Sequence, residues 1–410
     1  MGAYLQAPLQ HSIYVTDVNE QGETEYWKLH KALYGLKQAG HLWYDMLTHI
    51  MSKAGFCRCV GDEGVFIPNN SANGGVSIQS KAIIGTWVDD LVGIAPDNTD
   101  LNLVEEEIEK YVELEHRGQP SKLLGMECHW DVDGRELMLT QTTLIENVAA
   151  AHGVNGVKHL LPTDRILFEL DETRLCNPQE SKEFQRLVGG LLYIARTTRP
   201  DTAIQVNLLG RKLKNPSDLN LQAAKEVCRY LLTTRSEGLR LRAQAGEGLD
   251  IKVYTDASYG GEQARSQTGT LVLLGNQLVH WYSRRQDTVT LSITEAEYLA
   301  TCEGAKDASW IMLELIKTTM PSPTLLTDNE AADKLTRNHA YHRRTRHIDH
   351  KYHYVRQEAQ RGNLVIKGVK GKDQLADPLT KITPMATIST WKLQVGIVTS
   401  DSAKSGGRTG

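Results

Sequence analysis

The stretch "IKVYTDAS", residues 251–258, has the pattern of a short β-strand and carries an acidic residue, Asp256, where that strand ends. Two further strand patterns follow, "GTLVLL" and "LVHWYS", and then a helical pattern over residues 294–317. The next strand pattern, "TLLTD", again ends in an acid. Short apolar runs bounded by polar residues are typical of strands, and longer periodic runs are typical of helices. This order predicts a mixed α/β domain in the last third of the chain.

Four acidic residues of this region fall at related places in the predicted elements. Asp256 and Asp328 end strands, Glu297 lies in the first turn of the long helix, and Asp377 lies in a last helical pattern, "QLADPLTK". Strand ends on one side of a sheet and the start of a covering helix can converge, and carboxylates that meet there raise one another's pKa unless cations neutralise them. Oxygen ligands of this kind suit Mg²⁺. Two ions roughly 4 Å apart could clamp a phosphodiester, although each acid alone is more typical of a turn, a helix N-terminus or a surface.

The order of these elements and acids resembles the RNase H fold. The sequence motifs themselves resemble the RNase H domain of copia-type LTR retrotransposon polyproteins. They are "YTDASYGG", "SITEAEYLATCEGAKDASWI", "TDNEAA" and "DQLADPLTK". Upstream, "KALYGLKQAGHLWY", "WVDDLVGIA" and "LLGMECHWD" resemble the reverse transcriptase of the same polyproteins, so the resemblance covers about residues 3–382. It implies that Asp256, Glu297, Asp328 and Asp377 hold Mg²⁺, or Mn²⁺ in its place. Asp349, in "RHIDHKY", is the alternative fourth acid.

A second acidic feature, "TWVDDLVGIA" at residues 86–95, sets Asp89 and Asp90 side by side in an apolar run. Neighbouring side chains in a strand point to opposite faces, so a surface turn between two strands is the ordinary interpretation. The resemblance implies more, because the paired acids of reverse transcriptases lie on a sharp hairpin at the polymerase site. Asp89 is then expected to bind a catalytic metal ion, with Asp90 beside it.

Two departures from the family pattern affect the polymerase prediction. The family's further acid lies four residues before an Ala-aromatic-Leu stretch, which here is Ala3-Tyr4-Leu5, so that acid would fall before Met1. The resemblance therefore implies weak or absent polymerisation by the chain as given. The family's usual Pro-Arg is replaced by Gly40-His41. Lys37 and Gln38 are candidates for contacts near the incoming nucleotide, or else ordinary exposed helix residues.

Charge is unevenly distributed along the chain. Residues 335–372 hold ten Lys and Arg against two acids, although the net charge of the chain is −4. Such a stripe can follow nucleic-acid phosphates, and it can equally be a solvated helix face. The residues expected near phosphates are Arg343, Arg344, Arg346 and Lys351.

Composition and length limit the remaining possibilities. The chain has 410 residues, 40% hydrophobic and 23% charged, with six scattered cysteines, as in a soluble protein of a reducing compartment. It shows neither a signal peptide nor the roughly 18 apolar residues of a membrane span, so an intracellular location, cytoplasmic or nuclear, is expected. The predicted parts are a partial reverse-transcriptase palm (1–135), a mostly helical thumb or connection (136–245), an RNase H-like mixed-sheet domain (246–382) and a flexible tail (383–410).

The leading functional hypothesis is therefore a reverse transcriptase–RNase H segment. Its expected partners are an RNA template, a DNA primer, RNA–DNA hybrid and deoxynucleoside triphosphates. A catalytically inactive relic that only binds nucleic acid is the alternative. A transposase or integrase shares the RNase H fold but presents two Asp and then a late Glu, whereas Glu297 comes second here.

Overall fold

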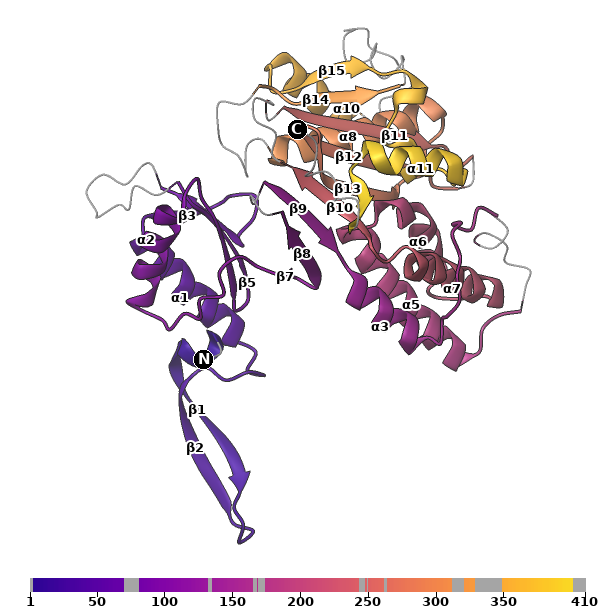
Figure 1. The fold of residues 1–410 in the computed structure, drawn as a ribbon. Helices are drawn as coiled ribbons and strands as arrows, with labels where there is room; N and C mark the ends of the chain where they lie inside the picture. The colour runs from indigo at the N-terminus through magenta and orange to yellow at the C-terminus, as the bar shows by residue number, and fades with distance from the viewer. Residues whose placement is uncertain are drawn as a thin grey trace. The chain divides into compact units, whose positions relative to one another are not determined.

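The structure is a computed structural model that describes residues 3–69, 81–131, 135–164, 168, 174–242, 248, 250–261, 264–311, 321–328 and 349–400. The chain separates into two compact units. The described residues up to Gly118 form the first unit, and those from Gln119 to Ser400 form the second. Figure 1 shows the elements along the chain.

The first unit contains a long hairpin and a small sheet with two helices. Its elements are η1 (Ala3–Gln6), β1 (Pro8–Val18), β2 (Thr24–Lys31), α1 (Ala39–Lys53), β3 (Phe56–Arg58), β4 (Val65–Pro68), β5 (Ile83–Trp87), β6 (Asp90–Ile94) and α2 (Asn98–Glu109). The sheet is antiparallel in the order β3-β4-β5-β6. Helix α1 buries Trp43, Leu47 and Ile50, whose spacing places them on one face. Helix α2 begins after Asp97, whose carboxylate accepts hydrogen bonds from the Thr99 and Asp100 amides.

The second unit begins with a helical part and its own sheet. The helices are α3 (Thr142–Ala151), α5 (Pro178–Thr197), α6 (Ala203–Gly210) and α7 (Asp218–Thr233), with η2 (Pro200–Thr202) between α5 and α6. The sheet runs in the order β16-β10-β9-β8-β7, formed by Ile397–Thr399, Glu237–Arg242, Glu136–Thr140, Met126–Trp130 and Lys122–Leu123. Helix α5 begins with a capping box, in which Asn177 and Glu180 satisfy each other's backbone amides.

A wholly buried ion pair lies where α5 passes into η2. The Arg199 guanidinium donates to the Asp201 carboxylate through Nε at 2.9 Å and a terminal nitrogen at 2.8 Å. The Tyr230 hydroxyl donates to the same carboxylate at 2.8 Å, and Arg199 also donates to the carbonyl of Thr234 at 2.9 Å. Arg199 holds the pKa of Asp201 below its ordinary value despite the burial. The pair therefore stays ionised and connects the turn η2 after α5 to the end of α7.

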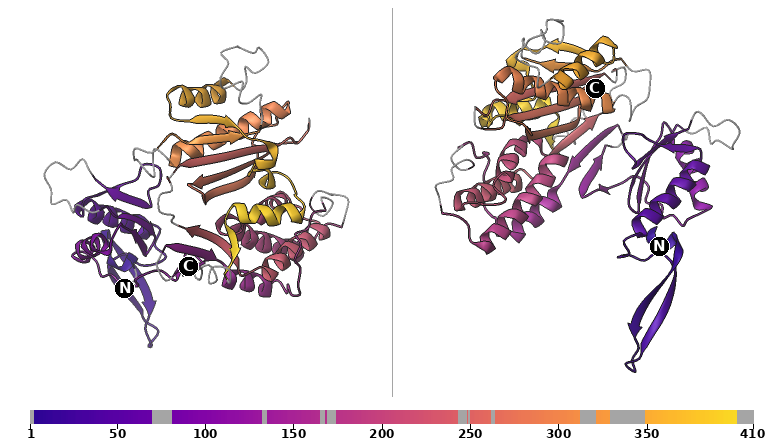
Figure 2. Two further views of the ribbon diagram at one scale, coloured as in Figure 1. Left: turned by 45° about the horizontal axis from the view of Figure 1, so that its top comes forward. Right: turned by 180° about the vertical axis from the view of Figure 1, so that it is seen from behind.

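A five-stranded mixed sheet follows, in the order β13-β12-β11-β14-β15. Its strands are β11 (Ile251–Ser258), β12 (Gln267–Leu274), β13 (Gln277–Arg285), β14 (Thr324–Thr327) and β15 (Val365–Gly368). The first three pair antiparallel, and β14 pairs parallel with both β11 and β15. Helix α8 (Ile293–Trp310) packs on β11 and β12, and α10 (Asp349–Gln360) packs against α8 (Figures 1 and 2). The predicted mixed α/β class with an RNase H-like mixed sheet is confirmed.

The C-terminal segment differs from its prediction. Residues 383–410 were expected to be a flexible tail, but α11 (Met385–Gln394) and β16 form within them, and β16 pairs with β10. Apolar residues lie among the Ser and Thr residues of this segment, and three of them, Trp391, Val395 and Ile397, are buried. Their burial explains why the segment folds. The predicted helix from Gln374 is also replaced by two short 3-10 turns, η5 (Gly371–Asp373) and η6 (Asp377–Leu379). None of the described helices is long and apolar enough to cross a membrane.

Candidate metal centre and acidic hairpin

Three of the predicted acids meet at one edge of the mixed sheet. Asp256 lies in β11, Asp328 directly follows the neighbouring parallel strand β14, and Glu297 lies near the start of α8, which covers β11. Each offers a carboxylate oxygen that lies within 4.8 Å of those of the other two. Asp256 and Glu297 are buried, whereas Asp328 is more exposed. Within the described residues, no other group of three potential metal ligands comes this close together.

Two glycines allow this close approach. Gly304 lies seven residues after Glu297, two helical turns along the same face of α8. A Cβ atom at Gly304 would lie 2.2 Å from Cγ2 of Thr255 in β11. Gly269 of β12 pairs with Asp256, and a Cβ atom there would lie 2.8 Å from both Cβ of Leu379 and Cγ2 of Thr380. The absence of side chains at these two positions therefore lets α8 pack closely on β11 and lets the segment after η6 pack closely on β12.

The segment after η6 adds two residues that the sequence did not single out. The Thr380 hydroxyl donates a hydrogen bond to Asp256. The Lys381 ammonium lies 3.7 Å from Oδ2 of Asp256 and 2.7 Å from Oδ1 of Asp377. Asp377 therefore lies next to the three acids but pairs with Lys381 and is not one of the group. Both residues belong to the motif "DPLTK", yet only the fold shows that this motif returns to β11.

The protonation of the centre follows from its burial. Burial raises the pKa of Asp256 to about 6, with Lys381 and the Thr380 hydrogen bond opposing it. Burial, reinforced by the charges of Asp256 and Asp328, raises the pKa of Glu297 to about 9. Oε2 of Glu297 is buried and finds no hydrogen-bond partner in the described part of the chain. Close carboxylates with an unsatisfied buried oxygen fit a hard divalent cation such as Mg²⁺.

Asp89 and Asp90 lie at the tip of the hairpin between β5 and β6. Trp87 pairs with Asp90, so Val88 and Asp89 form a two-residue turn. Val88 has a φ of 55°, a strained value for a β-branched residue. The Trp43 indole donates to the Val88 carbonyl at 2.7 Å, and the Tyr34 hydroxyl donates to Asp89.

The hairpin resolves the conflict that two adjacent acids would cause inside a strand. Both carboxylates are exposed at the turn, where water can solvate them. No third His, Cys or acidic residue of the described ranges completes a group of three around them.

The structure describes only some of the residues predicted to contact nucleic acid. Lys37 and Gln38 are exposed in the loop that leads into α1. Arg343, Arg344 and Arg346 lie outside the described residues. Lys351 and Asp349 lie in α10, but their side chains are outside the described part of the structure. Their roles stay predictions.

Comparison with known proteins identifies relatives over almost the whole chain. Residues 1–160 match the family described as reverse transcriptase (RNA-dependent DNA polymerase). The Pol polyprotein of transposon RE1 from Arabidopsis thaliana is 31% identical over 96% of this chain, and that of TNT 1-94 from Nicotiana tabacum is 29% identical over 90%. The chain spans only 27% and 28% of these two relatives. A putative transposon Ty5-1 protein from Saccharomyces cerevisiae is 32% identical over 73% of this chain and is covered over 97% of its own length.

The fold of this chain is also similar to parts of solved structures. LC11-RNase H1 matches 35% of this chain and 97% of its own, with 19% identity and a TM-score of 0.27. A foamy viral protease-reverse transcriptase in complex with dsDNA matches 90% of this chain and 70% of its own, with 10% identity and a TM-score of 0.44. The sequence relatives decide the assignment: the chain belongs to the copia-type retrotransposon Pol family, with a reverse-transcriptase region followed by an RNase H-like domain.

Proposed function

We propose that this chain is the reverse transcriptase–RNase H segment of a copia-type polyprotein and that it hydrolyses RNA within RNA–DNA hybrids. The observation that carries this proposal is the approach of Asp256, Glu297 and Asp328 to within 4.8 Å through one oxygen each. Their position at one sheet edge, open to solvent on the Asp328 side, lets a phosphodiester reach them.

The residues of this centre have different proposed roles in metal binding and in positioning. Asp256, Glu297 and Asp328 would hold Mg²⁺, or Mn²⁺ in its place, and Asp377 is the candidate for a fourth ligand. When bound, these ions would neutralise phosphate charge and lower the pKa of an attacking water. Thr380 orients the Asp256 carboxylate through its hydrogen bond. The 2′-hydroxyls and the shape of the hybrid, rather than its base edges, would select the substrate.

RNA-directed DNA polymerisation is the second activity that the family relationship supports for the longer polyproteins. In this chain Asp89 and Asp90 would contribute to that centre, with Lys37 and Gln38 near the incoming deoxynucleoside triphosphate. Within the described residues three acids meet at the metal centre and no third ligand joins Asp89 and Asp90, so hydrolysis is the activity that we propose first. The competing proposal, a relic that binds nucleic acid without cutting it, predicts binding alone.

A cleavage assay separates these proposals. The purified chain is incubated with labelled RNA–DNA hybrid and Mg²⁺, beside the variants Asp256→Asn and Glu297→Gln. The control variant Asp287→Asn removes an exposed acid of the same domain. We expect cleavage of the RNA strand by the parent chain and the control, and a loss of at least 100-fold, about 2.7 kcal/mol, in both active-centre variants. Cleavage that survives Asp256→Asn, or a chain that binds hybrid without cutting it, would remove the nuclease proposal.

A further inference from the structure

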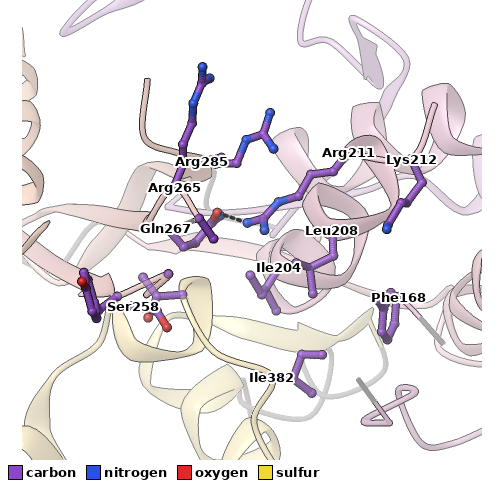
Figure 3. A pocket seen from close by; sticks show the side chains of 14 residues that line it. Phe168, Ile204, Leu208, Arg211, Lys212, Ser258, Arg265, Gln267, Arg285 and Ile382 are labelled. Atoms are coloured by element: carbon purple, nitrogen blue, oxygen red, sulfur yellow. Dashed lines mark hydrogen bonds between the residues drawn. The ribbon is translucent and has the colours of Figure 1, made fainter. Parts of the chain in front are cut away.

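A cavity of about 460 Å³ lies in the second unit where α6 meets the mixed sheet (Figure 3). One side is formed by Ile204 and Leu208 of α6 and by Ile382. The other side is formed by residues at the ends of β11, β12 and β13, including Ser258 and Gln267. Residues far apart in sequence therefore make one concave surface.

The charged side chains that line this cavity are all positive. Four of its lining side chains are cationic: Arg211, Lys212, Arg265 and Arg285. Among the described residues that line it, there is no carboxylate. Arg285 of β13 lies opposite Gln267 in the β12–β13 register, and Arg265 lies in the segment just before β12, so both line the cavity beside Gln267. A concave cluster of positive charge attracts anions, and guanidinium groups match phosphate oxygens.

One of these cations is held in place by a partly buried hydrogen-bond network. Arg211 donates a hydrogen bond to Oε1 of Gln267, as Figure 3 shows. The Gln267 amide then donates to Oδ1 of Asn207 at 3.1 Å and to the Ser283 hydroxyl at 2.7 Å. Asn207 also donates to the Ser283 carbonyl at 2.9 Å. The guanidinium is therefore positioned before any ligand arrives, which lowers the entropy cost of binding.

The cavity adjoins the metal centre through two residues. Ser258 lies two residues after Asp256 in β11, and strand alternation places both on the same face of the sheet. Thr380 lines the cavity and also donates its hydroxyl to Asp256. A nucleic-acid strand with one phosphodiester at the three acids can therefore continue towards the cationic side chains.

We propose that this cavity binds a backbone phosphate of the nucleic-acid strand that continues from the metal centre. The proposal rests on the proposed function, since that function supplies the strand. Arg285 of β13 and Arg265 of the segment before β12 contact the phosphate on one side, Arg211 and Lys212 contact it from the helical part, and the apolar side chains of α6 face the sugar. The helical part of the chain thereby takes a direct part in holding the substrate of the RNase H-like domain.

Binding of uncut hybrid tests the proposal. The full chain carrying Asp256→Asn is titrated against labelled RNA–DNA hybrid over a range of NaCl concentrations, with and without Arg265→Gln/Arg285→Gln. The control pair Lys182→Gln/Arg186→Gln removes the same charge from exposed positions of α5 outside the cavity. We expect the cavity pair to raise Kd about tenfold and to lower the slope of log Kd against log salt by about one to two. The control pair should leave both unchanged.

Three outcomes separate this inference from its alternatives. A cavity pair with the same Kd and slope as the control pair would overturn it, even if the parent chain cuts hybrid. Direct binding of inorganic phosphate that disappears in the cavity pair, while hybrid binding stays unchanged, would assign the cavity to a free phosphate and also overturn it. A changed slope in a chain that never cuts hybrid would support the cavity and remove only the proposed hydrolysis.

Discussion

The hydroxyl of Thr380 donates a hydrogen bond to the carboxylate of Asp256, across 124 residues of sequence. This bond joins the segment after η6 to the strand that carries the first acid of the metal centre. Thr380 also lines the cationic cavity, and Lys381 beside it lies 3.7 Å from the same carboxylate. The metal centre and the cavity therefore share one short segment, and its position affects both.

Replacing Thr380 tests how far this bond orients Asp256. Thr380→Val keeps the shape of the side chain but removes a donor to an ionised acceptor, worth about 1.5–3 kcal/mol. We expect the affinity of the chain for Mn²⁺, measured by calorimetric titration without substrate, to fall about tenfold or more. Thr380→Ser keeps the hydroxyl and should restore most of the affinity. Equal affinities of the Val and Ser variants would show that the bond does not orient the ligand.

The stability of the metal-free chain should depend on pH through Glu297. Its folded-state pKa, about 9, lies above its ordinary value of 4.5, so the folded chain retains a proton that the unfolded chain loses between these values. The contribution of Glu297 to the free energy of unfolding is therefore greatest below pH 4.5. It falls as the pH rises towards 9, by at most about 1.4 kcal/mol per pH unit.

Thermal unfolding at pH 6 and pH 8.5 measures this dependence. We expect a lower unfolding midpoint at pH 8.5 without metal and a larger increase on adding Mg²⁺ there, because the cation replaces the proton. Glu297→Gln cannot ionise, so it should flatten the pH profile. A parent chain that becomes more stable from pH 6 to pH 8.5 without metal would contradict the prediction.

The close contact between α8 and β11 makes Gly304 a sensitive position. Gly304→Ala would place a methyl group 2.2 Å from Cγ2 of Thr255, so the helix must move away from the strand. We expect a loss of about 1–3 kcal/mol in the free energy of unfolding, measured with urea. Because Glu297 lies on the same helix face, Mn²⁺ affinity should fall as well.

Gly189→Ala is the matched control for this change. Gly189 lies inside α5 and nothing lies within 4 Å of an added Cβ atom. The substitution should be neutral or should stabilise the chain by up to about 1 kcal/mol, from helix propensity alone. Similar losses in both variants would mean that close packing does not explain Gly304.

The sequence predicted the acids better than their surroundings. Asp256, Glu297 and Asp328 could be expected together because strand ends and the start of a covering helix can converge and because the family resemblance implies a shared site. Asp377, which was expected with them, pairs with Lys381. Thr380 and Lys381 could not be placed, since the expected helix from Gln374 would have carried them elsewhere. The cationic cavity was also missed, because Arg211, Lys212, Arg265 and Arg285 come from separate elements and no periodicity connects them.

The buried pair of Arg199 and Asp201 should dominate the stability of the helical part. Asp201→Asn removes the fully buried one of the two carboxylates that pair with Arg199 and leaves only Glu237, at 3.3 Å, so we expect a loss of about 3 kcal/mol. Glu146→Gln breaks the exposed pair between Glu146 and Arg235, about half exposed on each side, and should cost less than about 1 kcal/mol. Urea unfolding measures both, and comparable losses would contradict the difference in burial.

Trp43 of α1 should hold the turn that carries Asp89 and Asp90 in its strained conformation. Trp43→Phe keeps an apolar ring in the core but removes the indole donor to the Val88 carbonyl. A backbone with φ of 55° at a β-branched residue persists only if its surroundings enforce it, so the turn should become mobile. We expect faster amide hydrogen exchange at residues 87–90 and little change in β3 and β4. Val88→Gly removes the strain and should reverse most of that effect in the double variant. Unchanged exchange in Trp43→Phe would show that the strands alone hold Asp89 and Asp90 in position.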